Sequence, residues 1–253
     1  MKTSITQNKF IYITFWVIIW HLLSVIVSQD ILLVSPVTVF MRLLEMICEA
    51  DFYWSIWNTF SRIFVGFAFS AFVGTLLAIL SKKNQIIYNL CAPPMNVIKV
   101  TPVASFIILA LFWFQTKDLP AFISFIMVLP IFYSNIYEGI DTVDNKMLEM
   151  AKVYNLSKVK KIIYIYIPEM MPIIFSSLIL GLSIGWKSGI AAEVIAISSN
   201  TIGGQIQRAK VILETGDVFA WTITTIFISI GLEKIFIKLL DKVQRIILKK
   251  GMK

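Results

Sequence analysis

The chain has 253 residues, of which 58% are hydrophobic and only 15% are charged, and its mean hydropathy is +0.81. A soluble globular domain carries about 25% charged residues, so this composition excludes an ordinary soluble domain and places the chain among membrane proteins. The formal net charge of +8 is also typical of nucleic-acid-binding proteins. The positions of the basic residues along the chain decide whether the charge reflects nucleic-acid binding or orientation in a membrane.

Six apolar stretches approach the ~20 residues that a helix needs to cross the hydrocarbon core of a bilayer. They cover residues 10–27, 63–80, 96–114, 119–137, 173–197 and 218–240. The first is longer than a signal-peptide core and no small-residue cleavage site follows it, so we interpret it as a retained span. Residues 1–253 are therefore predicted to form a single all-α transmembrane domain of six helices.

Between the first two spans, residues 30–58 are predicted to be an external segment with an amphipathic helix that begins at Ser35-Pro36. The second and fifth spans carry small residues at every fourth position, which lets another helix approach closely. These stripes are Gly66, Ser70, Gly74 and Ala78, then Ser177, Gly181, Gly185 and Gly189. Glu193 continues the stripe of the fifth span, four residues after Gly189, so it is predicted to face protein rather than lipid.

The third span is irregular, because Pro93, Pro94 and Pro102 lie in or just before it and Lys99 interrupts it. Proline removes a helix hydrogen bond and bends the axis. Such backbone at membrane depth is tolerated where protein or a water-filled cavity covers it. Two interpretations stay open: a kinked gate near the inner face, or a short inner helix that precedes the span.

A basic, amphipathic loop over residues 144–166 separates the fourth and fifth spans. Asp144 can cap a first short helix, and Asn155 can end it because asparagine tolerates the left-handed conformation. Met147, Met150, Ala151 and Tyr154 are predicted to form one apolar stripe on that helix. Ser157 can cap a second short helix that carries Lys158, Lys160 and Lys161. A loop lying on anionic lipid would show the same amphipathicity.

The lysines and arginines predict the orientation of the spans. With both termini in the cytoplasm, the outside segments hold only Arg42, Lys117, Arg208 and Lys210, and the inside segments hold most of the other basic residues. Membrane orientation thus explains the net charge, and no nucleic-acid partner is expected. Cys48 and Cys91 fall on opposite sides of the membrane and predict neither a disulfide nor a metal site.

The 144–166 loop and the proline that follows it resemble the coupling loop of ABC importer permeases, which reads E-A-A-x-x-x-G with a proline thirteen residues later. Here Glu149, Ala151 and Pro168 match, with Met150 in place of the first alanine and Asn155 in place of the glycine. Four other segments are similar to the nitrate/sulfonate/taurine importer family. They are Asn58–Arg62 with Gly66, Lys99 with Pro102 and Ala104, Trp186 with Ala192 and Glu193, and Thr201–Gly203.

This resemblance implies a type I ABC importer permease fold in the plasma membrane of a prokaryote. It implies a homodimer in membrane lipid, docked on cytoplasmic ATPase subunits and supplied by an extracellular solute-binding protein. The chain is then not an enzyme and holds no cofactor, since ATP and Mg are bound by partner subunits. No G-x-x-x-x-G-K-[ST] phosphate loop occurs in the sequence. The expected solute is small and resembles nitrate, a sulfonate, taurine or a thiamine precursor.

The residues expected to couple the chain to the ATPase are Glu149, Ala151, Tyr154, Asn155 and Pro168, with Pro168 as the joint to the fifth span. The candidates for the pathway or gate are Lys99, Pro102, Trp186, Lys187 and Glu193. Lys187 is unusual, because an ionisable side chain within a span normally faces a cavity or a partner. Either it attracts an anionic solute, or it pairs with an acidic group across the dimer or extends toward the membrane surface.

A rival function is that of an ion-coupled secondary transporter, in which Lys187 and Glu193 would be the coupling groups. The absence of an internal sequence repeat and the presence of the coupling loop argue against it.

Overall fold

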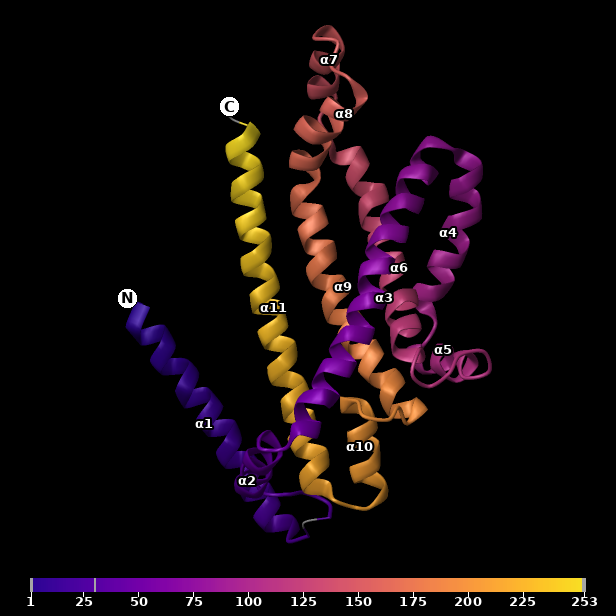
Figure 1. The fold of residues 1–253 in the computed structure, drawn as a ribbon. Helices are drawn as coiled ribbons and strands as arrows, with labels where there is room; N and C mark the ends of the chain where they lie inside the picture. The colour runs from indigo at the N-terminus through magenta and orange to yellow at the C-terminus, as the bar shows by residue number, and fades with distance from the viewer. Residues whose placement is uncertain (1, 30, 252–253) are drawn as a thin grey trace.

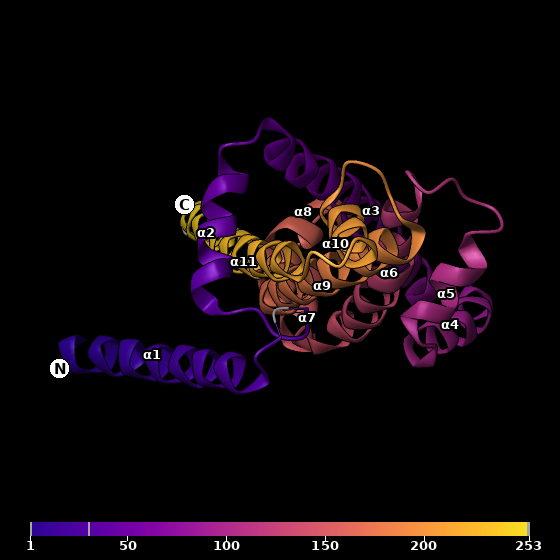
Figure 2. The same cartoon turned by 90° about the horizontal axis from the view of Figure 1, so that it is seen from below.

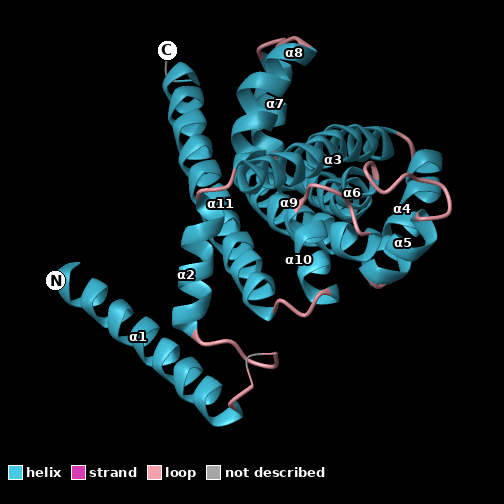
Figure 3. Ribbon diagram, turned by 60° about the horizontal axis from the view of Figure 1, so that its bottom comes forward, coloured by secondary structure: helices cyan, strands magenta, loops and turns pink. Residues whose placement is uncertain are grey.

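The computed structural model describes residues 2–29 and 31–251, which form helices joined by loops (Figures 1 and 3). No strand occurs within these ranges, which agrees with the predicted all-α class. In chain order the elements are α1 (Lys2–Val27), α2 (Pro36–Ile47), α3 (Ala50–Lys83), α4 (Gln85–Val100), α5 (Val103–Ala110), α6 (Leu119–Gly139), η1 (Ile140–Thr142), α7 (Asn145–Val153), α8 (Lys158–Lys161), η2 (Ile162–Tyr166), α9 (Ile167–Ala196), α10 (Ile202–Val211) and α11 (Thr215–Gly251).

Helices α3, α6 and α9 form the centre of the molecule, and their mutual packing is the most extensive in the fold (Figure 1). Among the described residues, three helical segments are long and apolar enough to cross a membrane: Ala50–Lys83, Leu119–Thr142 and Lys158–Ala196. They contain the predicted second, fourth and fifth spans. Helices α1 and α11 coincide with the first and sixth predicted spans but are not among these three. The count of six spans therefore stays a prediction.

The small-residue stripes lie where these three helices touch. A Cβ atom added to Gly66 of α3 would lie 2.1 Å from the carbonyl oxygen of Ala121 in α6. A Cβ added to Gly189 of α9 would lie 2.5 Å from Cγ1 of Ile63 in α3. Both distances are far below van der Waals contact, so the backbones approach closely only because glycine occupies these positions.

Polar side chains reinforce this contact. Ser124 Oγ of α6 donates to the carbonyl oxygen of Ile63 at 3.2 Å, and Asn135 Nδ2 donates to Ser177 Oγ of α9 at 2.9 Å. Each bond joins two of the three central helices, where the lipid offers no competing hydrogen-bond partner. Helix α6 is thus held to both of its neighbours by packing and by hydrogen bonds.

Residues 96–114, predicted as an irregular third span, do not form one continuous helix. Helix α4 ends at Val100, and α5 leaves it at an angle of 106°. Pro102 lies at the break and has no backbone N–H to continue α4. Helix α5 packs with Ala192 and Ala196 at the C-terminal end of α9, so the bend lies at the end far from α7 (Figure 1). Whether this bend acts as a gate stays a prediction.

The end of the molecule opposite α7 is formed by α2, α10 and the beginnings of α3 and α11 (Figure 1). Helix α2 begins at Pro36 as predicted, and Ser35 Oγ accepts a hydrogen bond from the Thr38 N–H at 3.2 Å. Arg42 of α2 forms ion pairs with Asp217 of α11 and, at 2.9 Å, with Glu45. These pairs tie the amphipathic helix to the start of the last helix.

Helix α1 diverges from the rest of the molecule (Figures 1 and 2). It packs chiefly against α2. Near its C-terminal end, Trp20 Nε1 donates to the Val34 carbonyl oxygen at 3.1 Å, and the Trp20 ring stacks on Phe219 of α11. Most of the side chains described in α1 are exposed in this single chain, so the bundle itself does not cover them.

We predict that Gly66→Ala lowers the free energy of unfolding by about 1–3 kcal/mol, the usual cost of overpacking, because the new methyl group must push α6 away from α3. Gly231→Ala in α11 is the matched control, since a Cβ there meets nothing within 4 Å. It should be neutral or slightly stabilising, because alanine favours helix more than glycine does. Equilibrium unfolding in detergent measures both, and equal stability of the two variants would contradict the packing argument.

Candidate functional site

The loop between α6 and α9 is shaped by local capping interactions. Asp144 Oδ1 accepts a hydrogen bond from the Lys146 N–H at 2.8 Å and so caps α7. Asn155 ends α7 in the left-handed region, with φ at 48°. The Asn155 N–H donates to the Lys152 carbonyl and the Leu156 N–H to the Ala151 carbonyl, each at 3.0 Å. This is the Schellman arrangement of a helix C-terminus, and it makes a compact turn.

The predicted apolar stripe of α7 divides into two faces. Ala151 is fully buried in a cluster with Val143, Ile165 and their neighbours, so it packs the loop internally and its side chain is not on the surface. Four large apolar side chains of α7 and the turn that follows are exposed instead. These four, called the loop tip below, are Met147, Met150, Val153 and Tyr154, with exposures of 40%, 47%, 78% and 73%. Glu149 is exposed beside them.

The sequence suggested that the second short helix of the loop is a separate element. In the structure it is not. Helix α8 continues through the π-helical turn η2 into α9, so that Lys158–Ala196 is one helical segment of 39 residues. Pro168, the predicted joint, lies inside this segment, within the first turn of α9. Pro168 has no N–H to donate within the helix. The Ile167 N–H reaches back five residues to the Ile162 carbonyl, which makes the turn wider without ending the helix.

At the other end of α9, Glu193 joins three elements. Its side chain is completely buried, and Oε2 accepts hydrogen bonds from Thr59 Oγ1 of α3 at 2.9 Å and from the Gly203 N–H of α10 at 3.0 Å. Thr59 Oγ1 in turn accepts from the Ile202 N–H at 2.9 Å. We call Glu193, Thr59, Ile202 and Gly203 the Glu193 junction. It satisfies the first backbone N–H groups of α10, which have no partner within the helix.

The segment that contains Glu193 and the segment Thr201–Gly203, which are separate motifs in the sequence, therefore meet at one place. A Cβ on Gly203 would lie 2.4 Å from the Cβ of Glu193, so only glycine fits beside the carboxylate. Thr201, which stands where the family usually has glycine, caps α10 by accepting from the Gly204 N–H at 3.1 Å. The role of Thr59 was not predicted, although it directly follows Asn58 in a segment singled out by the resemblance.

The remaining pathway candidates are dispersed. Lys99 Nζ donates to Ser134 Oγ of α6 at 2.6 Å, and Pro102 lies at the α4–α5 break. Trp186 is 3% exposed, whereas the next residue, Lys187, is exposed on the other side of α9. Within the described part of the chain, Lys187 forms no ion pair. Glu193 and Trp186 thus face protein, and Lys187 faces away from it.

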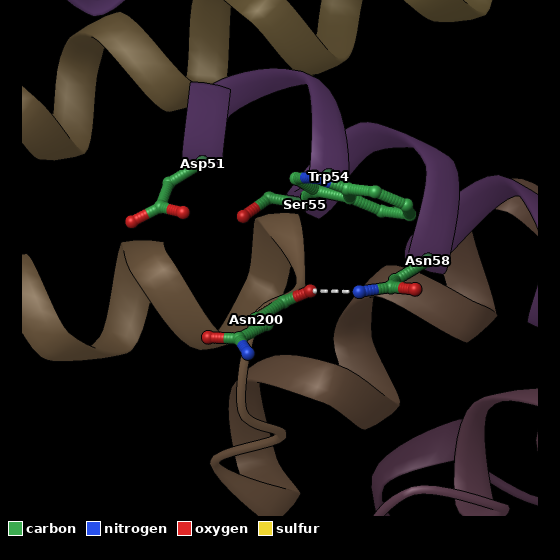
Figure 4. A pocket seen from close by; sticks show the side chains of 5 residues that line it. All are labelled: Asp51, Trp54, Ser55, Asn58 and Asn200. Carbon is green, nitrogen blue, oxygen red and sulfur yellow. Dashed lines mark hydrogen bonds between the residues drawn. The ribbon is translucent and has the colours of Figure 1, made fainter. Parts of the chain in front are cut away.

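A pocket that sequence reasoning missed lies beside the Glu193 junction (Figure 4). It has a volume of about 230 Å³ and is lined by Asp51, Trp54, Ser55, Asn58 and Asn200. We call it the outer pocket. Asn58 Nδ2 donates to the Asn200 carbonyl oxygen at 3.0 Å and closes one side. The partners are 142 residues apart in the chain, and no local pattern connects them.

Residues 70–243 match the family described as the binding-protein-dependent transport system inner membrane component. The chain belongs to this family. The matched region contains the C-terminal part of α3 and everything that follows up to the last turns of α11, including the α6–α9 loop and the Glu193 junction except Thr59. The permease is accordingly a multi-pass component of a binding-protein-dependent ABC transport system, with the type I fold that the resemblance implied.

Several relatives of the permease are named for the solutes that they transport. It is 26% identical over 231 residues to SsuC of Bacillus subtilis (strain 168), named as an aliphatic sulfonates transport permease protein, covering 88% of this chain and 81% of SsuC. It is 28% identical to the nitrate import permease protein NrtB of Synechocystis (55% of this chain, 51% of NrtB) and 24% identical to the bicarbonate transport system permease protein CmpB of Synechococcus elongatus (58% and 53%).

Among solved structures, the permease resembles an amino acid ABC transporter crystallised with histidines. The TM-score is 0.59 at 19% sequence identity, and the match covers 76% of this chain and 91% of that one. At this identity the likeness concerns the fold alone.

We predict that Glu193→Ala lowers the free energy of unfolding by about 2–3 kcal/mol, because it leaves the Thr59 hydroxyl and the Gly203 N–H buried without their acceptor. Glu193→Gln retains an acceptor oxygen and should lose less. Glu169→Ala, at an exposed position of the same helix, is the control and should change stability little. Denaturant unfolding of the solubilised permease measures all three, and equal losses for Glu193→Ala and Glu169→Ala would refute the role of the junction.

Proposed function

We propose that this permease forms the solute pathway of an ATP-driven importer and that its loop tip docks on a cytoplasmic ATPase subunit. The observation that carries the proposal is the exposure of four large apolar side chains on a loop whose own turn is tightly held. Exposed apolar groups gathered at one place are typical of contact surfaces between proteins. The membership in a binding-protein-dependent transport family supports an ATPase as the partner.

The same loop connects the docking surface mechanically to the far side of the molecule. The helical segment from Lys158 to Ala196 has 39 residues, which at 1.5 Å per residue is about 58 Å long. It begins next to the loop tip and ends at the Glu193 junction. Movement of the loop by an ATPase subunit is therefore passed along one helix to α3 and α10, where it opens or closes access to the pathway.

ATP and Mg bind to the partner subunits in this scheme, and the permease performs no chemical step. Its contribution is to change shape when the nucleotide state of the ATPase changes. The loop tip is then cytoplasmic, and so are both chain ends, because α1 begins and α11 ends on the side toward α7 (Figure 1). The α2–α10 end faces outward, toward the solute-binding protein.

A second copy of the chain and membrane lipid complete the assembly. The side of α9 that turns away from α3 and α6 carries Ser176, Leu180 and Lys187, all exposed in the single chain. A homodimer that places two such faces opposite each other would enclose a pathway between them. Glu193 is tied to α3 and α10 through its Oε2, which accepts two structural hydrogen bonds. The coupling loop favours an ATP-driven importer over the rival function of ion coupling.

The solute is a small anion. Sulfonates, nitrate and bicarbonate, which appear in the names of the relatives, are all anions. Lys187 is the basic residue of the α9 face just described, and it has no acidic partner within the described part of the chain. A lysine within a span is costly unless it faces water or an opposite charge, and an anion in the pathway supplies that charge during transport.

We predict that the double substitution Met150→Ser and Tyr154→Ser weakens binding of the ATPase subunit about 10- to 100-fold. The reason is the loss of about 1.5 kcal/mol of apolar burial for each side chain. Titration of the ATPase subunit onto the permease in nanodiscs gives the Kd. Val211→Ser, exposed at the opposite end, and Asn155→Gly, which preserves the left-handed turn, should bind as the wild type does. Unchanged affinity of the double variant would contradict the docking role of the loop tip.

For Lys187 we predict that replacement by methionine lowers ATP-driven uptake at saturating solute at least tenfold, which corresponds to about 1.4 kcal/mol of lost anion stabilisation. Lys187→Arg, which retains the charge, should lose much less. Proteoliposomes supplied with nitrate, bicarbonate or an alkanesulfonate, together with the solute-binding protein, provide the assay. Equal uptake by the methionine and arginine variants would show that the charge does not act on the solute.

A further inference from the structure

The outer pocket is built mainly by one face of α3. Asp51, Trp54, Ser55 and Asn58 follow one another at helical spacings of three, one and three residues, so that they share the face that Asn200 covers (Figure 4). Asn200 has φ at 54°, a left-handed conformation that turns the loop so that the Asn200 carbonyl meets Asn58. The buried Ser55 also accepts from Gln205 Nε2 of α10 at 3.5 Å.

The residues that line this pocket present mainly hydrogen-bond acceptors. It contains the Asp51 carboxylate, the Ser55 hydroxyl and two side-chain amide groups, and no basic residue lines it. Because the amide nitrogen of Asn58 is used in the bond to Asn200, its oxygen is left as an acceptor. Asp51 forms no ion pair with any residue that the structure describes. A group with several N–H donors and a positive charge matches this set of acceptors.

The size of the pocket narrows the choice of ligand. Its volume of about 230 Å³ is below the ~300–1,000 Å³ of typical pockets for small-molecule ligands, so it suits one side chain better than a complete organic ligand. A calcium ion would need six to eight oxygen ligands, usually with several carboxylates. The described residues contain no group of three or more His, Cys, Asp or Glu that could hold a metal ion.

We propose that the outer pocket receives a lysine or arginine side chain of the solute-binding protein. The cationic end pairs with Asp51 and the neighbouring oxygens, and the Trp54 ring, which is 61% exposed, covers the alkyl part of the incoming side chain. The proposal rests on the proposed function in one respect, namely that the α2–α10 end faces outward. There the pocket is open to a docking protein.

The pocket is also continuous with the Glu193 junction. Asn58 directly precedes Thr59, and Asn200 directly precedes Thr201, the cap of α10. A side chain bound in the pocket, against Asn58 and Asn200, therefore touches the two segments that hold α9 to α3 and α10. Docking at this pocket acts on the end of the same helix that the ATPase moves from the other side.

The test uses the complete wild-type transporter in nanodiscs, with its ATPase subunits and the solute-binding protein that stimulates their activity. Asp51→Lys should raise the Kd of the solute-binding protein at least tenfold, and Asp51→Asn should raise it less. Glu214→Lys is the control, because Glu214 is exposed at the same end and does not line the pocket. It should change the Kd less than twofold.

Charge reversal in the partner gives a second measurement. Exchange of one basic residue of the solute-binding protein for glutamate should restore its binding to Asp51→Lys while weakening its binding to the wild type. The inference is overturned if Asp51→Lys binds as tightly as the wild type, or if Glu214→Lys weakens binding equally. A wild-type transporter that binds no solute-binding protein would instead overturn the proposed function, so the two failures are distinguishable.

Discussion

The contact of α3, α6 and α9 at small residues is the constraint on which the rest of the structure depends. In lipid, two apolar helices gain nothing from leaving water, so they associate through close packing and hydrogen bonds. Gly66 and Gly189 allow that closeness, and Ser124 and Asn135 add the bonds. With these three helices packed together, the capped loop lies at one end of the bundle and the Glu193 junction at the other.

Glu193 shows how a charged group can be structural inside a membrane protein. Its carboxylate receives a hydroxyl and a backbone N–H, and both donors would otherwise be buried without an acceptor. The carboxylate also lies at the start of α10, the end of a helix whose dipole favours negative charge. The sequence also made Glu193 a candidate for the solute pathway, and that role stays a prediction.

The features predicted correctly from the sequence depend on residues close together in the chain. Asp144 and Asn155 act on backbone groups a few positions away, so capping rules were sufficient for them. The inward position of Ala151 depends on Val143 and Ile165, and the bend at Pro102 depends on where α5 finds its partners on α9. The outer pocket joins Asn58 to Asn200, and Glu193 meets Thr59 across 134 residues. Such pairings follow from tertiary packing, which helical periodicity does not describe.

Helix α1 is largely separate from the other helices of the molecule. Because it packs chiefly on α2 and reaches α11 through Trp20, the bundle of α3, α6, α9, α10 and α11 is closed without it. The region that matches the family begins only at residue 70, after α1 and α2 have ended. Helix α1 thus contributes little to the packing of these helices, and its apolar surface is available to lipid or to another protein.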